Sequence, residues 1–172
     1  MNTQLKGFNL IEVMVAVSIA SIISTMAAPS LNNLINHARS KSNIRSIQQL
    51  IQLARNHAIS LNARITVCPI ENNQCTNNWQ QGFTIFIDGG ESNIINTGDH
   101  ILHIAPAFNP NDIVYYNRKA IRFQPDGLAS GTNGTFRYCP EIYNSPFSKA
   151  VIVNQSGRIR FSRKNKIECK QN

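Results

Sequence analysis

Charge is scarce in this sequence, and acidic side chains are the scarcest. Only 15% of the 172 residues are charged, with nine Asp and Glu against 17 Lys and Arg, while 42% are hydrophobic. So few charges in so apolar a chain exclude wholesale disorder. No Gly-X-Y or heptad repeat runs through the chain, which excludes collagen-like and coiled-coil proteins. The net charge of +8 favours an anionic partner, whether nucleic acid, acidic lipid or an acidic protein face.

The sequence also lacks the signatures of common catalytic and metal sites. Neither a Walker A loop nor a Gly-x-Ser-x-Gly elbow is present. His100 and His103 would face opposite sides of a strand, which favours ordinary histidines over a metal site. Asp88, Glu91 and Asp99 frame a loop without EF-hand spacing, so we interpret it as a turn. We therefore expect no enzymatic activity, no cofactor and no metal ion.

One long apolar run lies near the N-terminus. Residues 8–28 carry a single charge, Glu12. As a helix, this run would span about 31 Å, close to the thickness of a bilayer core. The commonest interpretation of such a run is an uncleaved single-pass membrane anchor with Lys6 on the cytoplasmic side. The residues at its end fit a secretory cleavage site poorly.

Glu12 argues against a simple anchor. A carboxylate at the centre of a membrane helix costs about 2.5–3.5 kcal/mol on insertion scales, so it usually has a partner. A cut between Gly7 and Phe8 would create a free amino group on Phe8. In an assembly of parallel helices, Glu12 of one chain would pair with that amino group of its neighbour.

The segment from Lys6 to Glu12, KGFNLIE, resembles the type III signal of type IV pilins and type II secretion pseudopilins. That signal is a Gly, then a Phe, a Glu four residues later, and a long apolar helix. The resemblance implies that a prepilin peptidase cuts after Gly7 and N-methylates Phe8, so residues 1–7 are a leader peptide. It also implies an inner-membrane protein with one span, 8–28, and a periplasmic domain. The protein would later assemble with other pilins into a type IV pilus at the cell surface.

Apolar periodicity continues after this run. Pro29 is placed to kink the helix, because proline removes a backbone hydrogen bond. The next apolar residues recur at spacings of three and four: Leu31, Leu34, Ile35, Ala38, Ile44, Ile47, Ile51, Ala54, Ala58 and Leu61. We therefore predict one helix over about residues 8–60, whose second half, within 29–61, is amphipathic. Its solvated side is expected to carry Arg39, Lys41, Arg45 and Arg55.

Residues 62–172 change to short strand-like runs separated by turn residues. Predicted strands cover residues 63–70, 82–88, 101–105, 113–116, 120–124, 135–139, 150–154 and 158–162. These runs predict antiparallel β-sheets packed on the amphipathic half of the helix, an α+β fold of the type IV pilin kind.

The strand content resembles the GspH/FimT branch of the pilin superfamily. The resemblance rests on Trp79 with Gly82-Phe83, on Phe86 and Asp88, on Phe123-Gln124-Pro125-Asp126-Gly127, and on Gly157-Arg158-Ile159-Arg160. Each motif is short, but they occur in this order behind a prepilin signal.

The four cysteines are Cys68, Cys75, Cys139 and Cys169, which allow three pairings. Their spacings lack the CxxC pairs of a zinc site. We favour Cys68–Cys75, closing a small loop, and Cys139–Cys169, tying the C-terminal segment to an earlier strand. Disulfides indicate an oxidising compartment, here the periplasm.

The last 15 residues are strongly basic, with six cations against one acid, Glu168. The cations are Arg158, Arg160, Arg163, Lys164, Lys166 and Lys170. On a strand, Arg158 and Arg160 would share one face while Ile159 and Phe161 pack on the core. Rigid arginines beside a basic loop suit phosphate oxygens, which accept forked hydrogen bonds. The alternative is terminal charge that only confers solubility.

The Gly157-Arg158-Ile159-Arg160 segment resembles the Gly-Arg-x-Arg motif of FimT-like minor pilins that bind DNA during natural transformation. The resemblance implies that Arg158 and Arg160 contact double-stranded DNA without sequence preference, assisted by Arg163, Lys164 and Lys166. GspH-type pseudopilins can carry a similar ending. The alternative function is therefore a structural minor pilin or type II secretion pseudopilin that primes or caps fibre assembly without binding DNA.

Overall fold

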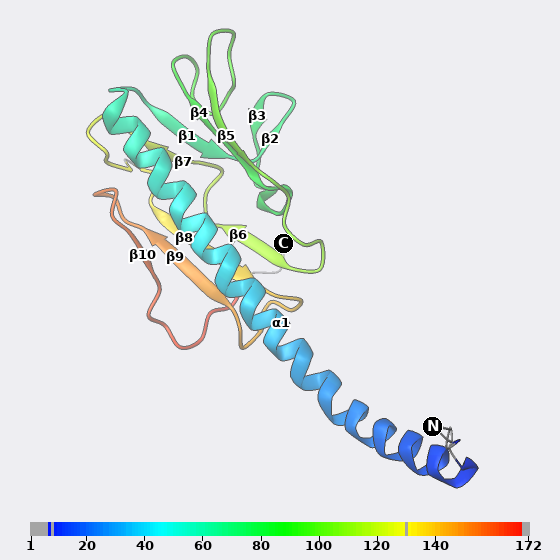
Figure 1. Cartoon of the computed structure of the whole chain (residues 1–172). Helices are drawn as coiled ribbons and strands as arrows, with labels where there is room; N and C mark the ends of the chain where they lie inside the picture. Colours follow the sequence, from blue (N-terminus) through cyan, green and yellow to red (C-terminus); the bar gives the residue numbers. More distant parts are fainter. Residues whose placement is uncertain (1–6, 8, 130, 170–172) are drawn as a thin grey trace, which may run out of the picture. The chain divides into compact units, whose positions relative to one another are not determined.

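The computed structural model describes residue 7, residues 9–129 and residues 131–169, with the backbone alone for residues 26–30. The chain divides into two compact units, Met1–Ala38 and Arg39–Asn172. One helix, α1 (Leu10–Ser60), contributes to both units (Figure 1). The prediction of a single long helix is thereby confirmed, with Phe8 outside the described residues. The helical backbone continues through Pro29, so the proline does not end it.

In the first unit, α1 exposes its apolar side chains. Hydroxyl groups within this stretch donate hydrogen bonds at 2.7 to 2.8 Å to carbonyl oxygens three or four residues earlier; they belong to Ser18, Ser21, Ser24 and Thr25. These four hydroxyl groups therefore find their hydrogen-bond acceptors within the helix itself. Leu31, Leu34 and Ile35, predicted to begin a buried stripe, are exposed, because the described residues of the first unit include no second element for them to contact.

Among the described residues, no helix combines the length and the apolarity that crossing a membrane requires. The expected membrane segment, residues 8–28, includes Phe8 and the side chains of residues 26–28, which lie outside the described part. Its membrane role stays a prediction.

In the second unit, all eight predicted strands are present, in two antiparallel four-stranded sheets. The first sheet has the order β5-β4-β1-β7, with β1 (Ile65–Cys68), β4 (Phe83–Ile87), β5 (Ile101–Ala105) and β7 (Ile121–Phe123). The second has the order β10-β9-β8-β6, with β6 (Ile113–Tyr116), β8 (Gly134–Cys139), β9 (Lys149–Val153) and β10 (Ile159–Phe161). The sequence pattern did not predict the small hairpin of β2 (Ile70–Glu71) and β3 (Gln74–Cys75), nor the 3-10 helix η1 (Trp79–Gln81).

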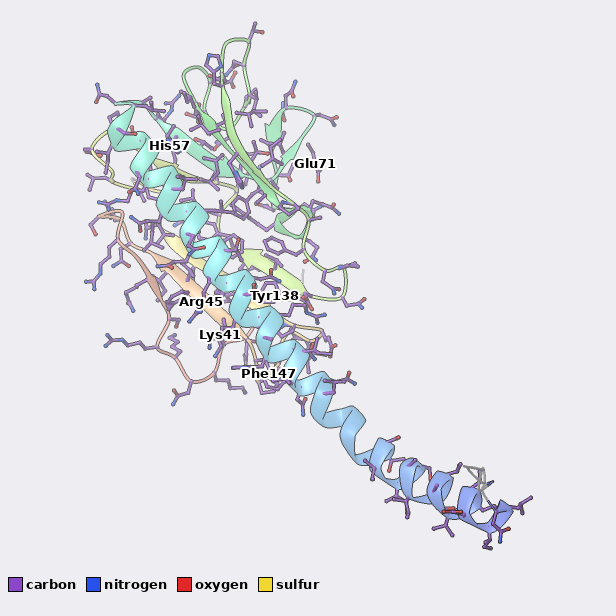
Figure 2. All side chains as sticks on the ribbon, in the orientation of Figure 1. Lys41, Arg45, His57, Glu71, Tyr138 and Phe147 are labelled. Carbon is purple, nitrogen blue, oxygen red and sulfur yellow. A yellow bond between two sulfur atoms is a disulfide. The ribbon has the colours of Figure 1, made fainter. Side chains whose placement is uncertain are left out.

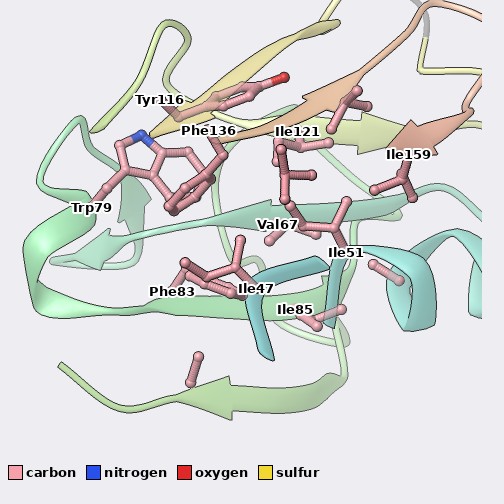
Figure 3. Close-up of a cluster of buried hydrophobic side chains, with 14 of the residues drawn as sticks. Ile47, Ile51, Val67, Trp79, Phe83, Ile85, Tyr116, Ile121, Phe136 and Ile159 are labelled. Atoms are coloured by element: carbon pink, nitrogen blue, oxygen red, sulfur yellow. The ribbon is translucent and has the colours of Figure 1, made fainter. Parts of the chain in front are cut away.

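The core of this unit lies between α1 and the two sheets (Figure 3). The predicted helix stripe is buried there at Ile44, Ile47, Ile51, Ala54 and Ala58. Leu61 is exposed instead, because α1 ends one residue before it. Trp79 is fully buried, stands edge-on to Phe136, and donates its indole N–H to the Arg118 carbonyl at 3.1 Å.

Two buried aspartates organise the ends of this core. Asp88 accepts hydrogen bonds from the Thr66 hydroxyl at 2.6 Å and from Arg64 at 3.1 Å. Asp112 accepts hydrogen bonds from Arg39 at 2.9 Å and from the Tyr138 hydroxyl. Burial, and then the hydrogen bond to Asp112, raise the pKa of Tyr138 well above its usual value. Arg39, predicted on the solvated side of the helix, is therefore a half-buried member of an ion pair.

Candidate nucleic-acid interface

The Gly-Arg-Ile-Arg sequence lies at the hairpin between β9 and β10. The Asn154 N–H closes the turn by donating to the Arg158 carbonyl at 2.9 Å. Gly157 lies inside the turn with a φ of 74°, where a side chain is strained. A Cβ there would overlap the Gly127 carbonyl oxygen, which accepts a hydrogen bond from Arg55 Nε at 3.0 Å. The hairpin is thus docked closely on a neighbouring loop. Arg55, predicted on the solvated side of the helix, instead holds this loop through its hydrogen bond to Gly127.

Arg158 and Arg160 extend from this hairpin into solvent. In the antiparallel pairing of β10 with β9, Arg160 lies opposite Ile152. Both arginines are exposed, while Ile159 between them is 9% exposed, which confirms the predicted alternation. Within the described residues, neither arginine forms an ion pair. Phe161, expected to pack beside Ile159, is instead 42% exposed, because it ends a strand at the sheet edge.

Residues 162–169 form a segment that we call the C-terminal strap, and both of its ends are fixed. At the start, the Ser162 N–H donates to a backbone carbonyl of β9 at 2.8 Å. At the end, the buried Cys169 donates its N–H to the Tyr143 carbonyl at 2.8 Å and forms a disulfide with Cys139 of β8. The predicted Cys139–Cys169 pairing is confirmed, and it anchors the strap to the second sheet.

The strap carries three exposed cations, Arg163, Lys164 and Lys166. Lys166 Nζ lies 2.9 Å from the Glu168 carboxylate. The hydrogen bond to Glu168, followed by its charge, raises the pKa of Lys166, so this ammonium group stays protonated. Arg163 and Lys164 have no acidic partner in the part of the chain described. Lys170 lies outside it.

A groove of about 440 Å³ lies between the strap and the second sheet. Its lining residues are Thr135, Arg137, Ala150, Ile152, Ser162, Lys164, Lys166, Ile167 and Glu168. Sequence reasoning missed Arg137, because it lies on an earlier strand far from the basic end of the chain. The available signal was the alternation of Thr135 and Arg137 with the buried Phe136 and Tyr138 along β8.

Lys41 and Arg45 extend from α1 and are exposed, as predicted (Figure 2). They lie on the same helix as the structural Arg39 and Arg55. The exposed cations of the second unit are thus found on the helix, on the C-terminal strap and hairpin, and at Arg118 and Lys119 after β6.

The predicted N-terminal site is described in part. Gly7 is exposed, Phe8 lies outside the described residues, and Glu12 is exposed in the first turn of α1. Glu12 lies beside an apolar helix face that includes Val13 and Ala16. Cleavage after Gly7 and the pairing of Glu12 with a neighbouring chain stay predictions.

The remaining predicted features are structural. Cys68 and Cys75 form the second predicted disulfide, which closes the β2–β3 hairpin. Asp99 accepts hydrogen bonds from the backbone N–H groups of Gly89 and Asn96, which supports a turn. Burial works to raise the pKa of Asp99, but these hydrogen bonds outweigh it and hold the pKa below its usual value. Among the described residues, no three His, Cys, Asp or Glu side chains group to hold a metal ion.

The helix packed on antiparallel sheets is the fold of a type IV pilin. Comparison with known families identifies the branch: residues 43–157 match the model of the family described as type II transport protein GspH, and the chain belongs to this family. It is accordingly a GspH-family protein with the type IV pilin fold.

Solved structures share the fold. Two crystal forms of the type IV minor pilin FimU from Pseudomonas aeruginosa (strain PAO1) match with TM-scores of 0.57 and 0.55, each at 19% sequence identity. The matches cover 72% and 71% of this chain, and 87% and 91% of the FimU chains. Comparison with curated proteins finds no match.

Proposed function

We propose that this minor pilin binds double-stranded DNA without sequence preference, for uptake in natural transformation. The contacts are made by the basic C-terminal region: Arg158 and Arg160 lead, and Arg163, Lys164 and Lys166 assist. The observation that carries the proposal is the availability of these charges. All five are exposed, and among the described residues only Lys166 has an acidic partner.

Other cations of the second unit are committed to the fold, which makes this availability informative. Arg64 pairs with the buried Asp88, and Arg39 pairs with the buried Asp112. The cations of the C-terminal region instead face solvent from a hairpin and a strap that are both held in place. The guanidinium group is a planar, preorganised fork of donors, so less side-chain entropy is lost for each hydrogen bond that it forms with phosphate oxygens.

The expected ligand is the backbone of a duplex rather than unstacked bases. Bases of single strands stack on exposed aromatic platforms. Here Trp79, Phe83 and Phe136 are buried, and the C-terminal region exposes one aromatic ring, Phe161, which is too little for a stacking platform. Phosphate contacts are indifferent to sequence, which suits the uptake of DNA of any origin.

The family match ends at Gly157, one residue before the first of these arginines. The DNA proposal therefore rests on the residues of this chain from 158 onward and on their resemblance to the Gly-Arg-x-Arg motif. It does not follow from family membership.

We also propose that prepilin peptidase cuts the chain after Gly7 and N-methylates Phe8. Before assembly, residues 8–28 hold the protein in the inner membrane with the rest in the periplasm. The sequence KGFNLIE supports the processing step. The two disulfides support an oxidising compartment for the second unit.

A second function is supported by the family description itself, type II transport protein GspH. In that function, the protein primes or caps fibre assembly and the basic strap faces another protein. A DNA-binding measurement distinguishes the two functions, because a protein that only primes or caps assembly does not need to bind DNA.

The test is a titration of labelled duplex DNA with the full chain in detergent, disulfides intact. The variant is Arg158→Gln plus Arg160→Gln, and the matched control is Arg118→Gln plus Lys119→Gln. The control removes the same charge from exposed positions that follow β6, which lies at the opposite edge of the second sheet from β10.

We expect saturable binding that falls by about tenfold or more in the first variant and changes little in the control. Equal losses of DNA affinity in both variants would show that binding depends only on the net charge of the protein and not on these two arginines. A folded parent that binds no DNA would contradict the proposal and favour the assembly function.

A further inference from the structure

The groove beneath the C-terminal strap is lined by hydrogen-bond donors, of which Thr135, Arg137 and Ser162 are not among the DNA contacts proposed above. Its sheet side includes Thr135 and Arg137 of β8, and its strap side includes Ser162, Lys164 and Lys166. Three cations thus line the groove, against one carboxylate, Glu168, which is already paired with Lys166. The groove is therefore positively charged, and its size lies in the range of sites for small groups.

Arg137 is both available and held in position. It lies opposite Tyr115 of β6 in the antiparallel register, and its guanidinium carbon is 5.9 Å from the centre of the Tyr115 ring. The ring face attracts the cation and limits its motion without neutralising its charge. Within the described residues, Arg137 has no acidic partner. Its charge is thus free for a ligand in the groove.

The hydroxyl groups of the groove complement this charge. The Ser162 hydroxyl oxygen accepts a hydrogen bond from the backbone N–H of Lys164 at 3.2 Å. The hydroxyl hydrogen of Ser162 is therefore free to donate to a ligand. Thr135 supplies a second hydroxyl on the sheet side. A phosphodiester carries one negative charge and offers only acceptor oxygens, so it matches a wall of cations and hydroxyl donors.

The groove lies on the face of the second sheet that also bears Arg160. In the strand register, Arg160 lies opposite Ile152, and Ile152 lies opposite Thr135. Because paired residues share a face of the sheet, Arg160 and Thr135 belong to the same row on the face that bears the groove. Arg137 lies on this face two residues further along β8. A ligand held by Arg160 at the edge can therefore extend over the sheet.

We propose that this groove receives a phosphodiester group of bound duplex DNA, held between Arg137 on the sheet and Lys164 on the strap. The inference rests on the DNA-binding function proposed above and extends its site from the strand edge onto the sheet. Continuity with the Arg160 row favours DNA over the phosphate headgroups of an anionic membrane.

The test measures duplex affinity of the full chain in detergent at several salt concentrations. The variants are Arg137→Gln, Lys164→Gln and both together, with Arg118→Gln as an exposed arginine outside the groove. We expect Arg137→Gln to weaken binding about fivefold, and the combined variant to make the log–log salt slope shallower by about 0.9, the contribution of the one phosphate that the two side chains share. Arg118→Gln should leave both quantities unchanged.

The combined variant tests whether the two side chains bind the same group. Shared binding predicts a combined loss smaller than the product of the single losses, whereas independent surface charges give the product. Melting temperatures of all variants check that the fold is intact.

Each alternative result overturns the inference in a recognisable way. If Arg158→Gln plus Arg160→Gln abolishes binding while Arg137→Gln equals Arg118→Gln, the groove is not a DNA contact and the proposed function stands. If the parent binds no DNA, both fail together. If Arg137→Gln weakens only binding to vesicles containing phosphatidylglycerol, the groove recognises a membrane instead.

Discussion

Gly157 fixes the direction of the two leading arginines. Its φ of 74° turns the chain between β9 and β10, and its lack of a side chain lets the turn approach the Gly127 carbonyl. Arg158 and Arg160 follow directly, so their exposure depends on this close approach. At this scale, the glycine of the Gly-Arg-Ile-Arg sequence is a structural requirement, and the arginines are the proposed DNA-binding groups.

Replacing Gly157 by Ala should therefore destabilise the protein by about 3 kcal/mol or more, since a strained φ and a steric overlap add together. Gly131→Ala is the matched control: its φ is 70°, but a Cβ there meets no atom within 4 Å. The control should cost about 1 kcal/mol, the backbone strain alone. Thermal and urea unfolding of both variants measure the difference. Equal losses would show that the hairpin is not closely docked.

Some residue roles follow from the sequence and others depend on the tertiary structure. The alternation of Arg158, Ile159 and Arg160 is local, and it was predicted correctly. The roles of Arg39 and Arg55 depend on Asp112 and the Gly127 carbonyl, which the sequence places far away. Strand order decides which distant groups meet, and a single sequence contains no signal for it.

The C-terminal strap is the element on which the proposed site depends most. It contributes three of the five proposed contacts and one wall of the groove. It contains no helix or strand of its own, and the disulfide to Cys139 fixes its end. Its geometry thus comes from its attachments rather than from backbone–backbone hydrogen bonds within it, none of which joins two of its described residues.

Changing both Cys139 and Cys169 to Ser should release the strap and open the groove. In the chain-entropy account, closing a loop of this length stabilises the fold by about 3–4 kcal/mol. We expect weaker DNA binding as well as a lower melting temperature.

The matched control changes Cys68 and Cys75 to Ser, removing a disulfide from the β2–β3 hairpin. The control should lose stability but keep its DNA affinity. Unchanged affinity in the first variant would make the strap's attachment irrelevant to binding.

Element by element, the longer strands were predictable because apolar runs and turn residues mark them. The β2–β3 hairpin was missed, since two-residue strands are too short to show a period. The groove was missed for a related reason: it arises where β8, β9 and the strap meet, and no contiguous pattern encodes that meeting.

At the scale of the whole molecule, the proposed function combines a helix for assembly with a domain that binds DNA. A single domain with a few phosphate contacts is expected to bind DNA in the micromolar range. Several copies along one pilus would raise the overall affinity, because later contacts form at high effective concentration. Weak individual binding is thus compatible with DNA capture.

Assembly is expected to depend on Glu12. We predict that Glu12→Ala reduces incorporation into the pilus while leaving the melting temperature of the second unit unchanged, because Glu12 is exposed in the first unit. Sheared pili probed by immunoblot measure incorporation, and Ser21→Ala in the same helical segment is the control. Normal incorporation of the Glu12 variant would contradict its pairing with a neighbouring Phe8.

The salt dependence of DNA binding tests the central claim, recognition of the phosphate backbone by the C-terminal region, most directly. Duplex affinity of the full chain would be measured from low to physiological salt. Contacts from Arg158, Arg160, Arg163, Lys164 and Lys166 predict a log–log slope of about −4.5, which Arg137 does not deepen because it shares the phosphate bound by Lys164. The slope should be the same for duplexes of unrelated sequence. A slope near zero, or one that changes with sequence, would contradict backbone recognition.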